Sequence, residues 1–274
     1  MAEHSPEKRG VPGSTPGPTT GKGRRFRQEP SPARLLVVRL EETPEQRSLR
    51  AELRSYFAEL MTDEVRDALR GGHEASAVRR SVIRRLGSDR MLGLGWPTEY
   101  GGGGRPATDQ FILFDEAQRA NCPMPFVTLN TVGPTLIEFG SDNQKQRFLP
   151  GILTGELVFA IGYSEPSAGT DLASLRTQAV RDGDEWVVNG SKIYTSGANE
   201  ADYIWLACRT DPEARKHKGI SLLIVPTDLT GFSWTPIVTV GGGPTTSTYY
   251  DDVRVPDTNL VGEVNGGWSM ITTQ

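Results

Sequence analysis

The sequence predicts an α+β fold, in which an N-terminal all-α helical domain precedes a small antiparallel β-barrel or sandwich. Up to Gly151 the apolar residues recur at helical spacing, and from Leu157 they alternate with a period of two. The chain has 274 residues, of which 36% are hydrophobic, and this is enough for two domains with cores of their own. We expect a disordered tail, a helical domain, a β domain and the start of a further helical domain, at 1–40, 41–156, 157–262 and 263–274.

The first 33 residues are rich in Pro, Gly, Ser, Thr, Lys and Arg and have almost no large apolar side chains. Such a segment buries too little surface to offset its ordering entropy, so we interpret it as disordered. A secretory signal is excluded because no apolar stretch lies near the start. A translation start further along, near Val37 or Val38, is an alternative.

Five helices are expected in the N-terminal domain. Thr43-Pro44-Glu45-Gln46 forms a capping box with proline at the first helical position, and apolar residues follow at helical spacing. A second helix is marked by apolar residues around Ile83, and a third covers Phe111–Ala120. Val127–Phe139 is predicted as a fourth, kinked at Gly133-Pro134. Another capping box at Ser141–Gln144 opens the helix that leads into the β domain.

The β domain is predicted from short apolar segments separated by turn residues such as Asp182-Gly183-Asp184 and Asn189-Gly190. After it, Gly266–Gln274 begins another helix. The expected strands are Leu157–Ile161, Trp186–Val188, Tyr203–Ala207, Ile220–Val225, Phe232–Val240 and Thr246–Val253.

Composition excludes several classes of function. The formal net charge of −4 gives no general attraction to nucleic acid or an anionic membrane, and the arginines at 24, 25 and 27 are too few for a nucleic-acid site. The two cysteines indicate a reducing compartment, the cytoplasm, rather than a disulfide framework. The three histidines are scattered, so no metal site is expected. No apolar run approaches the roughly 18 residues of a membrane-spanning helix.

Two motifs indicate a binding site for a flat heterocycle. Tyr163–Thr170 reads Y-S-E-P-S-A-G-T and combines two hydroxyl side chains with turn residues directly after a strand. Lys192–Ser196 reads K-I-Y-T-S and adds an aromatic ring and two further hydroxyls. Hydroxyls and backbone N–H groups beside an aromatic ring suit a flavin, which is rimmed with hydrogen-bond acceptors.

These motifs resemble the flavin-binding signature of the acyl-CoA dehydrogenases. Asp251–Pro256 is similar to that family's D-V-R-V-P segment, and Gly140–Pro150 resembles its helix leading into the middle domain. The resemblance runs from about Glu42 to the last residue. The G-Y-S-E-P-S-A-G-T-D run and A-D-Y-I-W-L-A-C-R-T-D-P look like one subunit of the heteromeric actinobacterial enzymes that dehydrogenate steroid side-chain CoA thioesters.

The resemblance implies FAD as cofactor and assigns contacts to it. Gly162, Tyr163 and Ser164 match positions at the pyrimidine edge of the flavin. The alternative is a structural Ser-Glu-Pro turn in which these groups only stabilise the local backbone. Thr170 matches a position that reaches the flavin phosphate or the CoA of the substrate, with a cap or turn hydroxyl as an equal alternative.

The second motif supplies the remaining contacts. Tyr194 replaces the usual tryptophan beside the ring, Thr195 follows it, and Ser196 matches the hydroxyl near flavin N5. The alternatives are a strand aromatic that covers the core and hydroxyls on the surface.

Other residues receive weaker assignments. Glu165 is structural in the family, and Asp171 is interpreted as a cap or turn residue. By resemblance, the predicted helix at Val127–Phe139 faces the acyl pocket, but an ordinary core helix with its polar residues outward is the favoured interpretation. The residues concerned are Leu129, Asn130, Thr131, Val132 and Thr135.

The resemblance implies desaturation of an acyl-CoA thioester at its α and β carbons, with hydride transfer to flavin N5. It places the proton-abstracting carboxylate beyond Gln274, so no catalytic residue is assigned and the C-terminal helical domain is missing. It also implies electron-transfer flavoprotein as acceptor and a homo- or hetero-oligomer. A non-catalytic scaffold subunit, an inactive fragment and an oxidase on the same fold remain as alternatives.

Overall fold

A computed structural model describes residues 41–71, 74–240 and 245–274. The predicted disordered tail lies outside the described residues, as does its arginine cluster. Glu42–Gln274 forms one compact unit.

The N-terminal part is helical, as predicted, and both capping boxes are confirmed. Thr43 and Ser141 each accept a hydrogen bond from a backbone N–H three residues on, and the glutamine there bonds back to the cap backbone. A short helix of eight residues was not predicted, because it is highly charged and buries no side chain completely. The α-helices before the sheet are α1 (Pro44–Leu60), α2 (Asp63–Arg70), α3 (Glu74–Ser88), α4 (Ala107–Arg119), α5 (Gly133–Phe139) and α6 (Asp142–Leu153).

The fourth expected helix is interrupted by a π-helical turn just before the Gly133-Pro134 position at which a kink was predicted. Thr128–Val132 forms this turn, η2, and α5 follows it directly. The indole Nε1 of Trp96 donates to the carbonyl of Leu129 at 3.0 Å. A Cβ on Gly133 would lie 1.9 Å from the Trp96 ring, so only glycine lets the indole pack against this turn.

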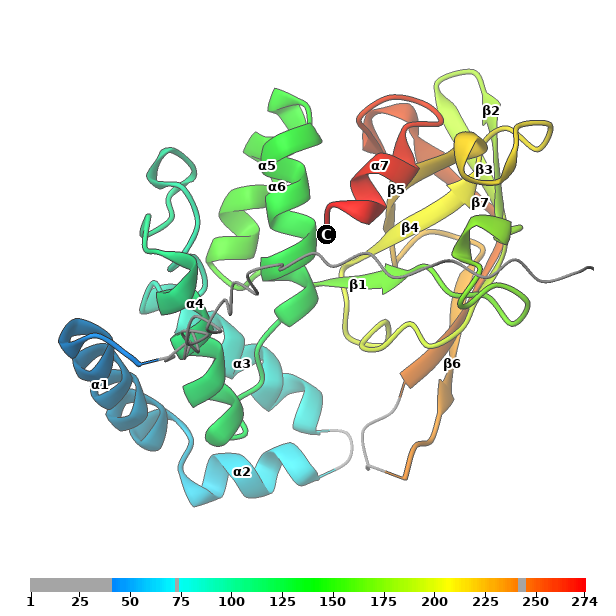
Figure 1. Ribbon diagram of the computed structural model, residues 1–274. Helices are drawn as coiled ribbons and strands as arrows, with labels where there is room; N and C mark the ends of the chain where they lie inside the picture. Colours follow the sequence, from blue (N-terminus) through cyan, green and yellow to red (C-terminus); the bar gives the residue numbers. More distant parts are fainter. Residues whose placement is uncertain (1–40, 72–73, 241–244) are drawn as a thin grey trace, which may run out of the picture. The chain divides into compact units, whose positions relative to one another are not determined.

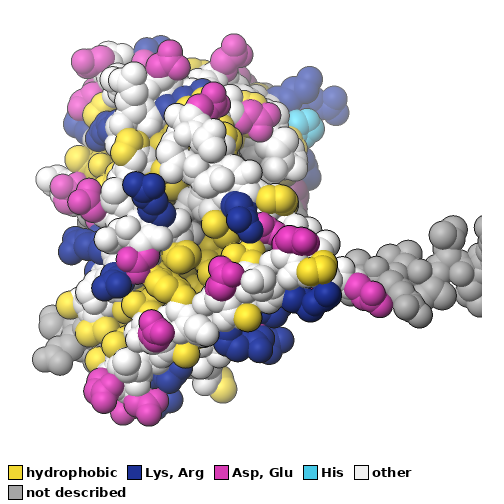
Figure 2. Space-filling model, turned by 90° about the vertical axis from the view of Figure 1, so that its left-hand side faces the viewer, with side chains coloured by type: hydrophobic (Ala, Val, Ile, Leu, Met, Phe, Trp, Pro, Cys, Tyr) yellow, Lys and Arg dark blue, Asp and Glu magenta, His cyan; other side chains and the backbone are white. Residues whose placement is uncertain are grey.

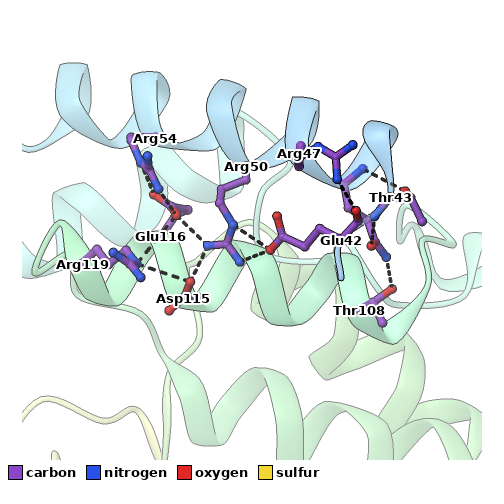
Figure 3. A network of polar contacts seen from close by, with 10 residues as sticks. Glu42, Thr43, Arg47, Arg50, Arg54, Thr108, Asp115, Glu116 and Arg119 are labelled. Atoms are coloured by element: carbon purple, nitrogen blue, oxygen red, sulfur yellow. Dashed lines mark hydrogen bonds and ion pairs between the residues drawn. The ribbon is translucent and has the colours of Figure 1, made fainter. Parts of the chain in front are cut away.

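Charged side chains join α1 to α4 (Figure 3). Arg50 and Arg54 of α1 both contact the Glu116 carboxylate on α4, at 2.7 and 2.9 Å. Arg50 also contacts Glu42 and Asp115, and Glu116 is almost completely buried. This charge network therefore fixes the N-terminal helix on the rest of the helical part.

The β part is a mostly antiparallel sheet in the order β6-β7-β3-β2-β4-β5-β8. β1 joins it through parallel pairing with β4, and a second parallel contact links β2 to β4. β2 was not predicted, since four of its five residues are exposed. The strands are β1 (Phe159–Gly162), β2 (Gln178–Asp182), β3 (Glu185–Lys192), β4 (Tyr203–Arg209), β5 (Ile220–Pro226), β6 (Phe232–Ile237), β7 (Thr245–Pro256) and β8 (Leu260–Val261).

One predicted turn is wrong. Asn189-Gly190 lies inside β3, where the register with β7 shifts between Val188 and Gly190. Gly190 has φ +144°, and a Cβ there would come within 2.7 Å of Thr177. A glycine in a strand can mark a bulge as well as a turn, and here it lets β3 pass close to the segment before β2.

The sheet has a buried layer on each side. Alternate residues of β4 face opposite ways: Trp205 and Ala207 belong to the core shared with the helices, whereas Leu206 and Cys208 belong to the second core. Figure 1 shows α1–α6 gathered on one side and the sheet, together with α7, on the other. The predicted C-terminal helix is α7 (Gly267–Thr272), which packs against β5. Within the described residues, no helix is long and apolar enough to cross a membrane.

Candidate functional site

The first predicted motif follows β1 as a tight loop. Gly162 ends the strand opposite Leu206, and a Cβ on it would meet the Ile204 side chain at 2.8 Å. Backbone hydrogen bonds of 2.9 and 3.1 Å between Glu165 and Ala168 close the turn. The loop is thus fixed at the edge of the strand that was predicted to lead into it.

Three buried charged side chains fix this loop to the rest of the protein. The Glu165 carboxylate accepts hydrogen bonds from Lys192 Nζ and from the N–H groups of Arg176 and Thr177, at 2.7–2.8 Å. Arg209 Nη2 donates to the carbonyls of Ala173 and Leu175, at 2.7 and 3.3 Å. We call Glu165, Lys192 and Arg209 the brace.

Burial and neighbouring charges shift the pKa values of Glu165 and Lys192. It raises the pKa of Glu165, but the Lys192 ammonium and the two backbone donors outweigh it, so this pKa lies below its ordinary value. Burial lowers the pKa of Lys192, and the Glu165 charge opposes that change. With three donors around it, Glu165 stays ionised and is not available to take a proton from a substrate.

Ser164 has free hydrogen-bonding groups. Its carbonyl accepts from the N–H of Ile193 at 2.8 Å, which ties the first motif to the second. Within the described part of the chain, neither its N–H nor its hydroxyl has a hydrogen-bond partner. The preceding carbonyl, of Tyr163, accepts from Lys192 Nζ at 3.0 Å. One N–H and one hydroxyl are therefore available to a ligand at this point.

The second motif presents its residues in different directions. Tyr194 has φ +62° and leaves 64% of its surface exposed, which is unusual for an aromatic residue. Ser196 is exposed, and its hydroxyl lies 3.0 Å from that of Thr245. Thr195 is fully buried, and its hydroxyl has no partner among the described residues. Tyr194 and Ser196 thus face outward, while Thr195 faces the core.

The remaining residues of the first motif, Thr170 and Tyr163, point in opposite directions. Thr170 is exposed at the end of the loop, and Asp171 next to it pairs with Lys216 at 2.8 Å. Tyr163 points inward: its hydroxyl accepts from Trp205 Nε1 at 3.0 Å and donates to Gln274. Burial raises the pKa of this hydroxyl, so it stays protonated.

Gln274 links the Tyr163 hydroxyl to Thr135 of the predicted acyl-pocket helix. Gln274 Nε2 donates to the Thr135 hydroxyl at 3.2 Å, which in turn donates to the Thr131 carbonyl. Leu129 and Val132 are completely buried, in agreement with the core interpretation of those positions.

A cavity of about 240 Å³ lies beside Ser196 and Gly197. Met124, Pro125 and Phe126 line it on the helical side, and Arg79 and Arg80 of α3 complete it. Arg79 is paired with Glu200 at 3.0 Å. The cavity is therefore mostly apolar, with charged groups at α3.

Sequence reasoning missed the brace. Lys192 stood in the motif without a role, and Arg209 received none, although an arginine in an otherwise apolar strand is a signal of a buried partner.

Two family models match this chain. The N-terminal domain of acyl-CoA dehydrogenases matches residues 43–156, and their middle domain matches residues 160–253. Among curated relatives, acyl-CoA dehydrogenase FadE26 of Mycobacterium tuberculosis is 57% identical over 86% of this chain, and FadE29 of the same organism is 59% identical over 85%. The chain spans about 60% of the length of these two relatives.

Solved structures give the same result. The ChsE4-ChsE5 complex from Mycobacterium tuberculosis superposes with a TM-score of 0.81 at 58% identity, covering 86% of this chain and 60% of that one. The Tcur3481-Tcur3483 steroid ACAD gives 0.81 at 62% identity, covering 85% and 61%. With both matched domains in this order, the chain belongs to the acyl-CoA dehydrogenase family.

Proposed function

We propose that this chain is a FAD-binding subunit of an acyl-CoA dehydrogenase. The observation that carries the proposal is the pair of donors on Ser164 that have no partner among the described residues, close in the fold to an exposed aromatic, Tyr194, in a left-handed conformation. Strained backbone of this kind is found at sites that position a ligand. A flavin has acceptors along its pyrimidine edge and a flat face, so it fits both features.

Each predicted residue has a place in this proposal. Gly162 lets the loop pass close to β4, Ser164 donates to the pyrimidine edge, and Tyr163 fixes the loop from the inside. Tyr194 stacks beside the ring and Ser196 donates near N5. Thr195 positions Tyr194 and Ser196 through its backbone, which forms hydrogen bonds with Thr246, and not through its core-facing hydroxyl. Exposed Thr170 reaches toward the flavin phosphate or the CoA.

The reaction we propose is α,β-desaturation of an acyl-CoA. The bound flavin supplies the hydride acceptor. The chain's own residues orient the ring and shape one wall of the acyl pocket through the cavity beside Ser196. Glu165 accepts hydrogen bonds from three donors, so we do not propose it as the base of this reaction.

The substrate class and partners are proposed from the relatives. One solved relative is described as a steroid ACAD, so we propose a steroid side-chain CoA thioester as the acyl group. Both structural relatives are complexes of two different subunits, which favours a hetero-oligomer in the cytoplasm with electron-transfer flavoprotein as acceptor. A scaffold subunit that completes a neighbour's flavin site is the second candidate, and it rests on the same observation.

Titration with FAD tests the cofactor. We expect Ser164→Ala and Ser196→Ala each to weaken FAD binding by about 2–12-fold, since each removes one neutral hydrogen bond of about 0.5–1.5 kcal/mol. Ser167→Ala is the matched control, because Ser167 is an exposed serine of the same loop. Equal affinities in all four proteins would contradict the assignment of the flavin edge to Ser164 and Ser196.

A further inference from the structure

Lys192 keeps a charge where an apolar side chain would fit. Its side chain is completely inaccessible, and Nζ is 2.8 Å from Glu165 Oε1 and 3.0 Å from the Tyr163 carbonyl oxygen. Such buried pairs are often no more stable than apolar replacements of the same volume. Stability alone is therefore a weak explanation for this lysine.

The second contact of Lys192 points to another role. The carbonyl of Tyr163 and the N–H of Ser164 are the two ends of one peptide group. A cation bonded to the oxygen polarises this group, and hydrogen bonds in such a chain strengthen one another. The N–H of Ser164, which has no partner among the described residues, thus becomes a stronger donor toward whatever binds there.

The net charge of the brace is positive, which also favours polarisation of the Tyr163–Ser164 peptide. The brace contains two cations, Lys192 and Arg209, and one carboxylate, Glu165. Arg209 is 8% exposed, and its donors bond to carbonyls of the loop and of Lys216. Along the hydrogen-bond chain the ammonium lies between the carboxylate and the Tyr163–Ser164 peptide, so the free N–H experiences the positive group more strongly.

We propose that Lys192, acting through the Tyr163–Ser164 peptide, makes this site prefer reduced flavin over oxidised flavin. The inference rests on the proposed function, because it takes a flavin to be the ligand. Reduction adds electron density to the pyrimidine edge, where a polarised donor stabilises it. Lys192 is thus a polarising and positioning residue that does not touch the ligand.

Binding of FAD in its two redox states tests the proposal. Dissociation constants for oxidised FAD and for FAD reduced under anaerobic conditions are measured by calorimetry with the full chain. The main variant is Lys192→Met with Glu165→Gln, which removes both charges and leaves no ion unpaired. We expect the ratio of the oxidised to the reduced constant to fall about tenfold, since a charged donor is replaced by an apolar group.

Further variants separate polarisation from a structural role. Lys192→Arg keeps the charge and should keep most of the ratio. Lys192→Met alone leaves the carboxylate unpaired and should lower the ratio further than the double variant does. Lys218→Met, at an exposed lysine, is the control and should not change it. Near-ultraviolet circular dichroism of each variant checks the fold.

The outcomes are distinguishable. An unchanged ratio in the double variant, with FAD still bound, would overturn the role of Lys192 and leave the proposed function standing. If the unmodified chain binds FAD in neither redox state, the proposed function fails and this inference fails with it. If Lys192→Arg does not fold, the double variant still decides.

Discussion

Arg50 Nη1 on α1 lies 2.7 Å from Glu116 Oε1 on α4, and Arg54 Nη2 lies 2.9 Å from the same oxygen. The Glu116 side chain is 1% exposed, so two cations from one helix share a buried carboxylate of another (Figure 3). The guanidinium of Arg54, together with that of Arg50, holds the pKa of Glu116 at about 2, below its ordinary value of 4.5.

This relationship predicts an acid-sensitive contribution to stability. The folded-state pKa is depressed, so the carboxylate stabilises the fold above about pH 4.5 and loses this effect as the pH falls toward 2. Glu116→Gln should lower the free energy of unfolding by about 1–3 kcal/mol at pH 7. In urea titrations at pH 7 and 3.5, the difference between the two proteins should shrink at the lower pH. Asp67→Asn, in an exposed pair with Arg70, is the control and should change little.

Two buried threonines allow a matched prediction. Thr195 Oγ1 has no partner among the described residues, whereas Thr128 Oγ1 accepts from the Phe159 N–H at 2.9 Å. Thr195→Val should leave stability unchanged or raise it, while Thr128→Val should lower it by about 1–3 kcal/mol because a buried N–H loses its acceptor. Thermal unfolding with FAD absent measures both.

The same Thr195→Val variant tests the site. Because the hydroxyl faces the core, its FAD affinity should equal that of the unmodified chain. A weaker affinity would mean that Thr195 turns toward the ligand when it binds.

Because Trp96 packs directly against Gly133, a single methyl group added at this glycine should lower the stability of the fold. Gly133→Ala places a Cβ 1.9 Å from the indole ring, and overpacking of this kind costs about 1–3 kcal/mol. Gly169→Ala is the control, since a Cβ there meets nothing within 4 Å. Equal melting temperatures for the two variants would show that the ring can move aside.

Local signals in the sequence predicted most of the fold. Both capping boxes and the apolar strand segments from β3 to β7 are encoded by neighbouring residues, so they could be recognised without the tertiary structure. α2 and β2 were missed because they bury little apolar surface, and burial is what produces a periodic pattern. Gly190 was misassigned because a bulge depends on the partner strand, which lies about 60 residues away.

The candidate site was predictable in its outward residues and not in its support. Ser164, Tyr194 and Ser196 stand in recognisable motifs. The brace joins residues from three segments that are distant in sequence, and nothing in the spacing of Glu165, Lys192 and Arg209 indicates that they meet. The inward orientation of the Tyr163 hydroxyl likewise depends on Trp205, on another strand.

Parallel pairing of β1 with β4 has a consequence for how the protein folds. Phe159 pairs with Tyr203, so the strand before the candidate site finds its place only after a long intervening segment has been organised. Contacts between distant parts of a chain form slowly, because the entropy of closing the loop is lost before the contact stabilises it. We therefore expect the loop after β1 to be among the last regions to gain protection from hydrogen exchange during refolding. A newly made chain would then acquire its ligand-binding surface only once the sheet is complete.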